Sequence, residues 1–214
     1  MRLGSPIFLG YFPVGAAFGV LATTIGFTAG QAVACSATAL AGAGQFVALE
    51  LLRGGAGAVA VVAATTVVNL RYVLFGATLS PYLAGASAPL QSSLAFTLTD
   101  ETFAVNVTDA RRGLATSASM LGVGVVAWTG WVSGTALGAV TAASLGDAGA
   151  WGVQFAMPAM FTALLVAQVE SRRHLWVAAL AAAVALTASA ALPGAWYILL
   201  ATALAATAGA VTSR

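Results

Sequence analysis

Thr97-Leu98-Thr99-Asp100-Glu101-Thr102-Phe103 is the most unusual stretch of this sequence, because it holds two adjacent carboxylates between apolar segments. The 214 residues include only 7% charged and 60% hydrophobic side chains. If residues 89–108 cross a bilayer, Asp100 and Glu101 lie about 16 to 18 Å from the start of that segment, near the midplane of a hydrocarbon core about 30 Å thick. A carboxylate there costs about 2.5 to 3.5 kcal/mol, and such residues mark ion, proton or substrate routes.

The composition is typical of a helical membrane protein. Soluble domains carry about 25% charged residues, and several apolar runs reach the roughly 20 residues that cross a bilayer. We therefore predict an all-α polytopic membrane protein, one domain over residues 1–214, surrounded by the lipid bilayer. No basic stripe indicates a nucleic-acid partner. Cys35 has no second cysteine to pair with, so we expect it to be a small buried residue.

The apolar pattern predicts eight spans. Their approximate bounds are 5–28, 31–52, 56–79, 88–108, 114–142, 151–169, 174–192 and 195–211. With eight spans, one side of the membrane receives all the arginines at span ends: Arg2, Arg53, Arg111, Arg112, Arg172, Arg173 and Arg214. Because short cytoplasmic loops collect Lys and Arg, we expect a multi-pass protein of the cytoplasmic membrane with both termini in the cytoplasm.

Proline and glycine indicate that some spans are broken. Pro13 and Pro158 lie inside the first and sixth predicted spans, and an interior proline removes a hydrogen bond and kinks a helix. Similar positions in oppositely directed spans suggest an inverted repeat of spans one to three with spans six to eight; independent proline kinks are the alternative. Small residues recur every four positions at Gly130, Gly134 and Gly138, which predicts a face for close helix contact.

Arg71 is the other charged residue inside a predicted span, a few ångströms in depth from the acidic pair. An unpaired buried charge is strongly unfavourable, so we expect an ion pair between Arg71 and one carboxylate. Burial and a neighbouring negative charge favour the protonated form of the other acid. We assign Asp100 to the ion pair and Glu101 to proton exchange, with the reverse assignment and a purely structural ion pair left open.

Polar groups at similar depth predict a substrate site. Two glycines before a buried Gln let the backbone approach a ligand, and freed amides and carbonyls hold the carboxylate and ammonium of an amino acid in transporters. Interhelical packing and hydrogen bonding are the alternative. The candidate substrate-binding residues are Gln45, Gly44, Asn69, Pro13, Thr97 and Tyr11.

Catalysis finds little support in the residues. His174 is the only histidine and lies beside two arginines. Neither a metal-ligand spacing nor a phosphate-binding Gly-x-x-x-x-Gly-Lys segment is present. We expect no enzyme, no catalytic residue, no cofactor and no metal.

Four segments resemble the AzlC family of branched-chain amino acid permeases, in that family's order and over essentially the whole chain. They are GYFPVGAAFG (10–19), AGAGQF (41–46), NLRYVLFG (69–76) and LTDETF (98–103). The chain departs from the family in having Gly44 instead of Ser before Gln45, and Tyr72 instead of His.

The resemblance implies a secondary transporter that exports valine, leucine and isoleucine, driven by a proton gradient. It also implies a small, separately encoded membrane subunit of the AzlD type. Asp100 or Glu101 would then be the proton-coupled acid. A channel, or a structural subunit of a small-solute permease complex, is the alternative function.

Overall fold

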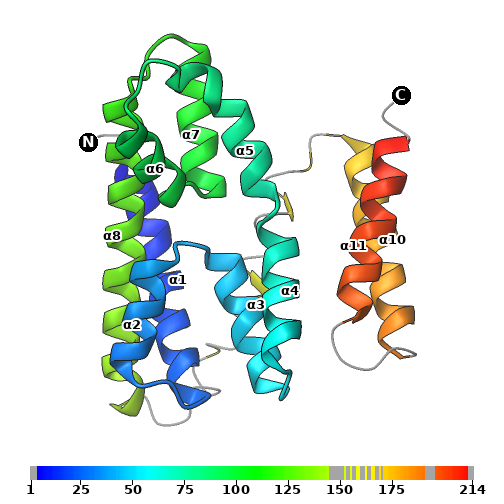
Figure 1. Cartoon of the computed structure of the whole chain (residues 1–214). Helices are drawn as coiled ribbons and strands as arrows, with labels where there is room; N and C mark the ends of the chain where they lie inside the picture. The colour runs from blue at the N-terminus through cyan, green and yellow to red at the C-terminus, as the bar shows by residue number, and fades with distance from the viewer. Residues whose placement is uncertain are drawn as a thin grey trace.

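The computed structural model describes residues 4–144, 171–190 and 196–211, and between 145 and 170 only residues 152, 155, 158, 159, 162, 165, 166 and 169. All regular structure in this part of the chain is helical, so the predicted all-α membrane fold is confirmed. Figure 1 shows the longer helices: α1 (Gly4–Thr24), α2 (Ala29–Thr38), α3 (Gly42–Arg53), α4 (Ala58–Asn69), α5 (Arg71–Leu79), α6 (Ala88–Phe96), α7 (Asp100–Arg111), α8 (Ser117–Thr141), α10 (Arg172–Ser189) and α11 (Trp196–Val211). The predicted span 151–169 and the predicted break at Pro193 lie outside the continuously described segments.

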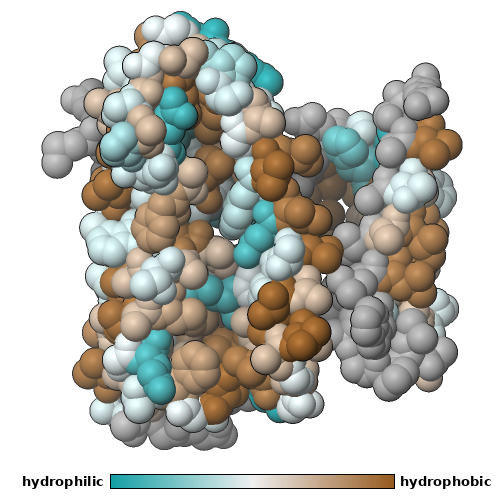
Figure 2. All heavy atoms as spheres, in the orientation of Figure 1, coloured by the Kyte–Doolittle hydropathy of each residue, from teal (hydrophilic) through white to brown (hydrophobic). Residues whose placement is uncertain are grey.

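Length and apolar composition fit a membrane crossing for three stretches of the described chain: Pro6–Thr24, Ala58–Leu83 and Ser117–Thr141. The second stretch joins α4, α5 and the following short helix η1 (Ser80–Leu83). Figure 2 shows apolar side chains over the outer face of α4 and α5. Val59, Val62 and Leu74 are 85%, 63% and 69% exposed, which is the surface that a lipid environment favours.

Two of the predicted spans are hairpins of short helices that turn back at mid-depth. The predicted span 31–52 consists of α2 and α3, with a break at 39–41, and both helices lie at the same end of the molecule. The predicted span 88–108 consists of α6 and α7, with a break at 97–99, and this hairpin enters from the opposite end. Both breaks therefore lie in the interior, where the two hairpins approach each other.

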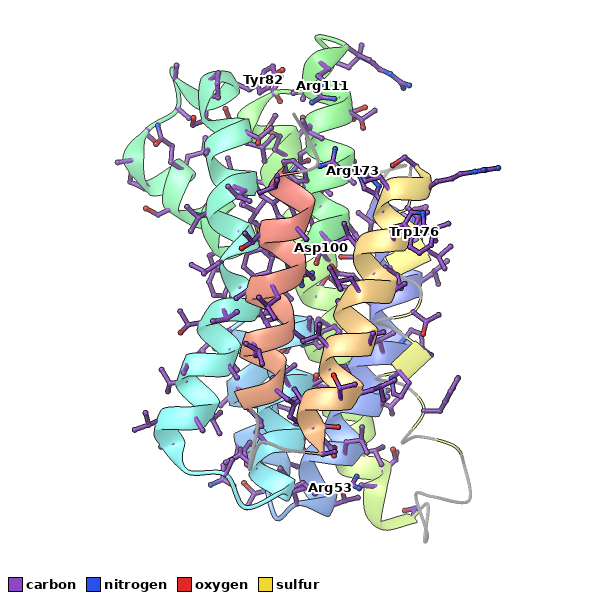
Figure 3. All side chains as sticks on the ribbon, turned by 90° about the vertical axis from the view of Figure 1, so that its right-hand side faces the viewer. Arg53, Tyr82, Asp100, Arg111, Arg173 and Trp176 are labelled. Carbon is purple, nitrogen blue, oxygen red and sulfur yellow. The ribbon has the colours of Figure 1, made fainter. Side chains whose placement is uncertain are left out.

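The hairpins correct the predicted placement of the arginines. Arg53 closes α3 at one end of the molecule, whereas Arg111 and Arg173 lie at the other end (Figure 3). The expectation that these arginines share one side is wrong for Arg53, because α3 returns to the end at which α2 began. The start of α1 and the end of α11 do lie at the same end of the molecule in Figure 1.

The local sequence explains the break before α7, at residues 97–99, better than the break before α3, at residues 39–41. Thr99 caps α7, because its side chain accepts the N–H of Thr102 while the Thr102 hydroxyl accepts the N–H of Thr99. This reciprocal pair satisfies two otherwise free N–H groups. The cap residue of α3 is Ala41, which offers no side-chain acceptor. Pro13 lies within the unbroken helix α1, so the predicted break there is wrong.

The segments α2–α5 and α6–α8 have the same internal order. α3 and α7 are both 12 residues long, and their first residues, Gly42 and Asp100, are 58 positions apart. Gly55 and Gly113 follow them with φ of 75° and 70°, a left-handed conformation that glycine adopts without strain. The next helices, α4 and α8, begin 59 positions apart. Because their hairpins enter from opposite ends, the two segments have the arrangement of an inverted repeat. The predicted repeat of spans one to three with spans six to eight involves residues 151–169, which lie outside the continuously described segments.

The core is a parallel contact between α1 and α8. A Cβ at Gly130 would lie 3.1 Å from the ring of Phe8, and a Cβ at Gly134 or Gly138 would overlap the carbonyl oxygen of Phe12 or Ala16. The predicted close-contact face of α8 is therefore confirmed. At the other side of the molecule α10 and α11 pack on each other, and α11 contacts α4.

Candidate functional site

A cavity of about 440 Å³ lies where both hairpins meet α1, α5 and α8. Its polar lining consists of Tyr11, Tyr72, Thr99, Asp100 and Glu101. Its other lining residues are Pro6, Ile7, Gly10, Val14, Leu40, Gly42, Ala43 and Trp131. A largely apolar wall with a few convergent polar groups, at this size, is typical of a small-molecule site.

An ion pair joins α5 to α7 beside the cavity. Nη2 of Arg71 lies 2.9 Å from Oδ2 of Asp100, and their side chains are 24% and 16% exposed. Each residue is the first of its helix, directly after a break, so the two breaks bring the charges together. Figure 3 shows Asp100 midway along the molecule. The ion pair expected from the sequence is present, with Asp100 as the partner of Arg71.

Glu101 is held differently from Asp100. The hydroxyl of Tyr11 donates a hydrogen bond to Oε2 of Glu101 and lies 2.7 Å from Oγ1 of Thr99. Within the described residues Glu101 has no ion-pair partner. The cavity therefore contains two carboxylates and one neighbouring guanidinium, and the second carboxylate contacts only neutral donors there.

The α2–α3 hairpin approaches from the end opposite to the α6–α7 hairpin (Figure 1) and contributes the N-terminus of α3 to the cavity lining. The N–H groups of Gly42, Ala43 and Gly44 make no hydrogen bond within the described part of the chain. Free N–H groups at a helix N-terminus carry partial positive charge. Gly42 and Ala43 line the cavity, so it has unpaired amides on one side and carboxylates on the other.

Gln45 lies behind the cavity wall rather than in it. Its Oε1 accepts a hydrogen bond from Nε1 of Trp131 at 2.8 Å, and its Nε2 donates to Oγ of Ser36 at 3.3 Å. Its Nε2 also donates to Sγ of Cys35, a half-buried thiol. With both ends of its amide used and only 5% of its surface exposed, Gln45 fixes the position of Trp131.

Gly44 and Asn69 contact each other outside the cavity lining. A Cβ at Gly44 would lie 2.9 Å from Nδ2 of Asn69, so glycine gives the space that the amide occupies. Oδ1 of Asn69 is buried without a hydrogen-bond partner in the described residues. The pair thus packs α3 against α4 at the last of the three residues with free N–H groups.

Thr97 and Pro13 are the other predicted substrate-binding residues that do not line the cavity. Thr97 is 6% exposed, and its hydroxyl donates to the carbonyl oxygen of Ser93 at the end of α6. A Cβ at Gly124 would overlap the Thr97 side chain, so Thr97 packs against α8. Pro13 is exposed on the outer surface of α1.

Three cavity residues are absent from the substrate-binding residues predicted from the sequence: Trp131, Tyr72 and Thr99. Trp131 is 2% exposed and meets Tyr11 edge to face, with ring centroids 5.7 Å apart. The Arg71 guanidinium lies 5.4 Å from the ring centroid of Tyr72. The available signal was a bulky indole next to Gly130 and Gly134. The glycines mark the face of α8 that packs on α1, so the Trp131 side chain is expected on a different face of the helix.

Comparison with known proteins places the chain in a family. A family model described as "AzlC protein" matches residues 6–145. The chain belongs to this family. Inner membrane protein YgaZ of Escherichia coli is 32% identical over 180 residues, covering 81% of this chain and 74% of that protein. A membrane protein of Archaeoglobus fulgidus is 32% identical over 183 residues, covering 85% of this chain and 79% of that protein.

A transport name also occurs among the relatives of this AzlC family member. The branched-chain amino acid transport protein AzlC of Bacillus subtilis is 26% identical over 171 residues, covering 79% of this chain and 66% of that protein. No solved structure matches the chain. The family resemblance stated from the four sequence segments is confirmed, and the chain is a membrane protein of a transport family.

Proposed function

We propose that this chain is a secondary transporter that exports branched-chain amino acids across the cytoplasmic membrane, rather than an enzyme. Two findings support the proposal. The family includes a protein named for branched-chain amino acid transport. The cavity of about 440 Å³ lies at mid-depth between two re-entrant hairpins, an arrangement by which transporters hold small solutes.

The observation that carries the proposal is the opposed polarity of the two cavity walls. The substrate α-carboxylate accepts hydrogen bonds from the free N–H groups at the start of α3. The α-ammonium lies against Glu101. The branched side chain then packs among Ile7, Val14 and Leu40. A zwitterion brings no net charge, whereas an acidic or basic side chain would add an unpaired charge to an apolar pocket.

Proton coupling is assigned to Glu101. Arg71 neutralises Asp100, which leaves Glu101 as the cavity carboxylate without a cationic partner in the described residues. Binding of the substrate ammonium and binding of a proton compete at such a group. We propose that Glu101 exchanges these two ligands during the cycle, with the Tyr11 hydroxyl as its donor in the empty cavity.

The proposed orientation places the end with Arg111 and Arg173 in the cytoplasm. Arg53, at the other end, is accompanied by Glu50 at 3.7 Å, so that end carries less uncompensated positive charge. Both chain termini are then cytoplasmic. We treat residues 1–214 as one transporter domain and propose a small AzlD-type membrane subunit as its partner, on the family resemblance alone.

The test uses the chain in proteoliposomes with labelled leucine, with and without an imposed pH gradient. Glu101→Gln should abolish the response of leucine flux to the gradient. Glu50→Gln, which removes an acid from a surface pair 55% exposed, should leave the response unchanged. Flux that ignores the gradient in the unmodified chain removes proton coupling, and leucine flux without counterflow makes the protein a channel.

A further inference from the structure

A second cavity, of about 580 Å³, lies between α5, α6, α7 and α8. Tyr72 lines both this cavity and the first, so the two meet at its ring. Asn106 also lines the second cavity, is 5% exposed, and its side chain makes no hydrogen bond in the described chain. The amide atoms of Asn106 are not among the side-chain atoms that are fully buried without a partner, so a polar ligand or water in the cavity can reach them.

The inverted repeat gives this cavity a counterpart in the other half of the molecule. Gly76 and Leu94 line the second cavity. The residues at the same places in the other repeat are Thr135, 59 positions from Gly76, and Ser36, 58 positions from Leu94. Oγ of Ser36 lies 2.8 Å from Oγ1 of Thr135, and both residues are fully buried. Gly76 and Leu94 thus border a cavity, whereas the equivalent residues Thr135 and Ser36 are in direct contact.

Two equivalent aromatic residues bound the first cavity. Tyr72 and Trp131 are 59 positions apart in the sequence and both line it. Beyond Tyr72 lies the second cavity. Beyond Trp131 lie Gln45, Ser36 and Thr135 in a continuous chain of hydrogen bonds. On the Tyr72 side the first cavity thus meets a second cavity, whereas on the Trp131 side three hydrogen-bonded side chains of the described chain lie behind the ring.

We propose that the second cavity is the access route of the substrate, and that the buried Ser36–Thr135 contact is the closed form of an equivalent route on the opposite side. This inference rests on the proposed transport function. In the opposite state, the α2–α3 hairpin leaves α8 and breaks the Ser36–Thr135 and Trp131–Gln45 contacts. The α6–α7 hairpin then closes on α5, which brings Gly76 against Leu94. Exchange of conformation between inverted repeats gives access to one side at a time.

Disulfide locking tests the closed contact. In a Cys35→Ala background, Ser36→Cys and Thr135→Cys are combined, because two hydroxyls in hydrogen-bonding contact suit a disulfide after a small shift. Oxidation should reduce leucine counterflow at least tenfold, and reduction should restore it. Undiminished counterflow in the fully cross-linked protein overturns the inference. The reduced form of the same variant is the control for folding.

Thiol labelling tests the open route without any transport readout. Asn106→Cys is added to the disulfide-locked variant, in which the thiols at positions 36 and 135 are consumed by the cross-link. The remaining thiol should react with a charged methanethiosulfonate applied at the Arg111 end. Ala48→Cys, the equivalent position on α3, should react at least tenfold more slowly from either side. Equal reaction rates, or no reaction at Asn106→Cys, overturn the inference. If labelling follows this pattern while the reduced protein moves no leucine, the proposed function fails and the two-route geometry stands.

Discussion

Removing one partner of the Arg71–Asp100 ion pair should destabilise the fold more than removing both. With 2.9 Å between Nη2 and Oδ2, the charge centres lie roughly 4 Å apart, and their attraction is about 4 kcal/mol at an effective dielectric constant of about 20. Breaking a buried pair costs about 3 to 5 kcal/mol, because the remaining charge is left uncompensated. Exposures of 24% and 16% place this pair toward the lower figure.

Arg71→Met and Asp100→Asn should each lower stability by about 3 kcal/mol. In a chain of this length that corresponds to a fall of about 6 to 12 °C in the unfolding midpoint. The double variant should recover at least about 2 kcal/mol relative to the sum of the single changes. Nε of Arg71 is already buried without a partner, so Asp100→Asn should be the more damaging single change.

The assay is a double-mutant cycle on detergent-solubilised protein, followed by tryptophan fluorescence during heating. The Glu50–Arg53 pair provides the matched control, because its side chains are 55% exposed and 3.7 Å apart. A cycle on that pair should give a coupling of about 0.5 kcal/mol or less. Strictly additive effects at Arg71 and Asp100 would refute the reasoning that each needs the other.

Two further predictions follow from contacts of α1. Gly138→Ala should lower the unfolding midpoint sharply because its Cβ overlaps the Ala16 carbonyl, whereas Gly122→Ala, with nothing within 4 Å, should be neutral or stabilising by up to about 1 kcal/mol; equal midpoints would contradict the close α1–α8 contact. Tyr11→Phe removes the donor to Glu101, a charge-assisted bond of about 1.5 to 3 kcal/mol, and should reduce leucine counterflow about 10- to 100-fold. Unchanged counterflow would exclude a role for that hydroxyl.

The depth of the acidic pair and its arginine partner could be read from the sequence. Depth depends on residue counts from span ends. The chain turns back at the break before Asp100, whereas α4 and α5 continue in one direction through Leu70, so the depth of Arg71 follows the residue count. A buried carboxylate requires a cationic partner, and Arg71 was the arginine that lies inside a predicted span. Elementary electrostatics therefore predicted the pairing, although not that both residues begin helices.

The re-entrant hairpins could not be recognised by apolar length. Two short helices of 10 and 12 residues contain as much apolar sequence as one crossing helix. The distinguishing signals were local: the Thr99 and Thr102 cap, and a glycine in left-handed conformation two residues after each of α3 and α7. A 58-residue offset between Gly55 and Gly113 was visible in the sequence but has meaning only once the helices between them are known.

Gln45 shows why polar residues at the right depth are ambiguous. Its partner Trp131 is 86 positions away, on a helix whose rotation is set by the glycine contacts with α1. Nothing in the neighbourhood of Gln45 indicates that its amide faces that indole instead of the cavity. The direction of a side chain within a helix bundle depends on tertiary packing. The sequence therefore predicted Gln45 in the site, whereas Trp131 lines the cavity and Gln45 holds it from behind.

Competition for labelled leucine counterflow tests the opposed cavity walls most directly. Unlabelled leucine should compete, whereas isopentylamine, which lacks the carboxylate, and 4-methylpentanoate, which lacks the ammonium, should each compete at least about 100-fold more weakly, since each loses a charge-assisted contact of about 3 kcal/mol. If either analogue competes as well as leucine, the wall that was assigned to the missing group does not bind it.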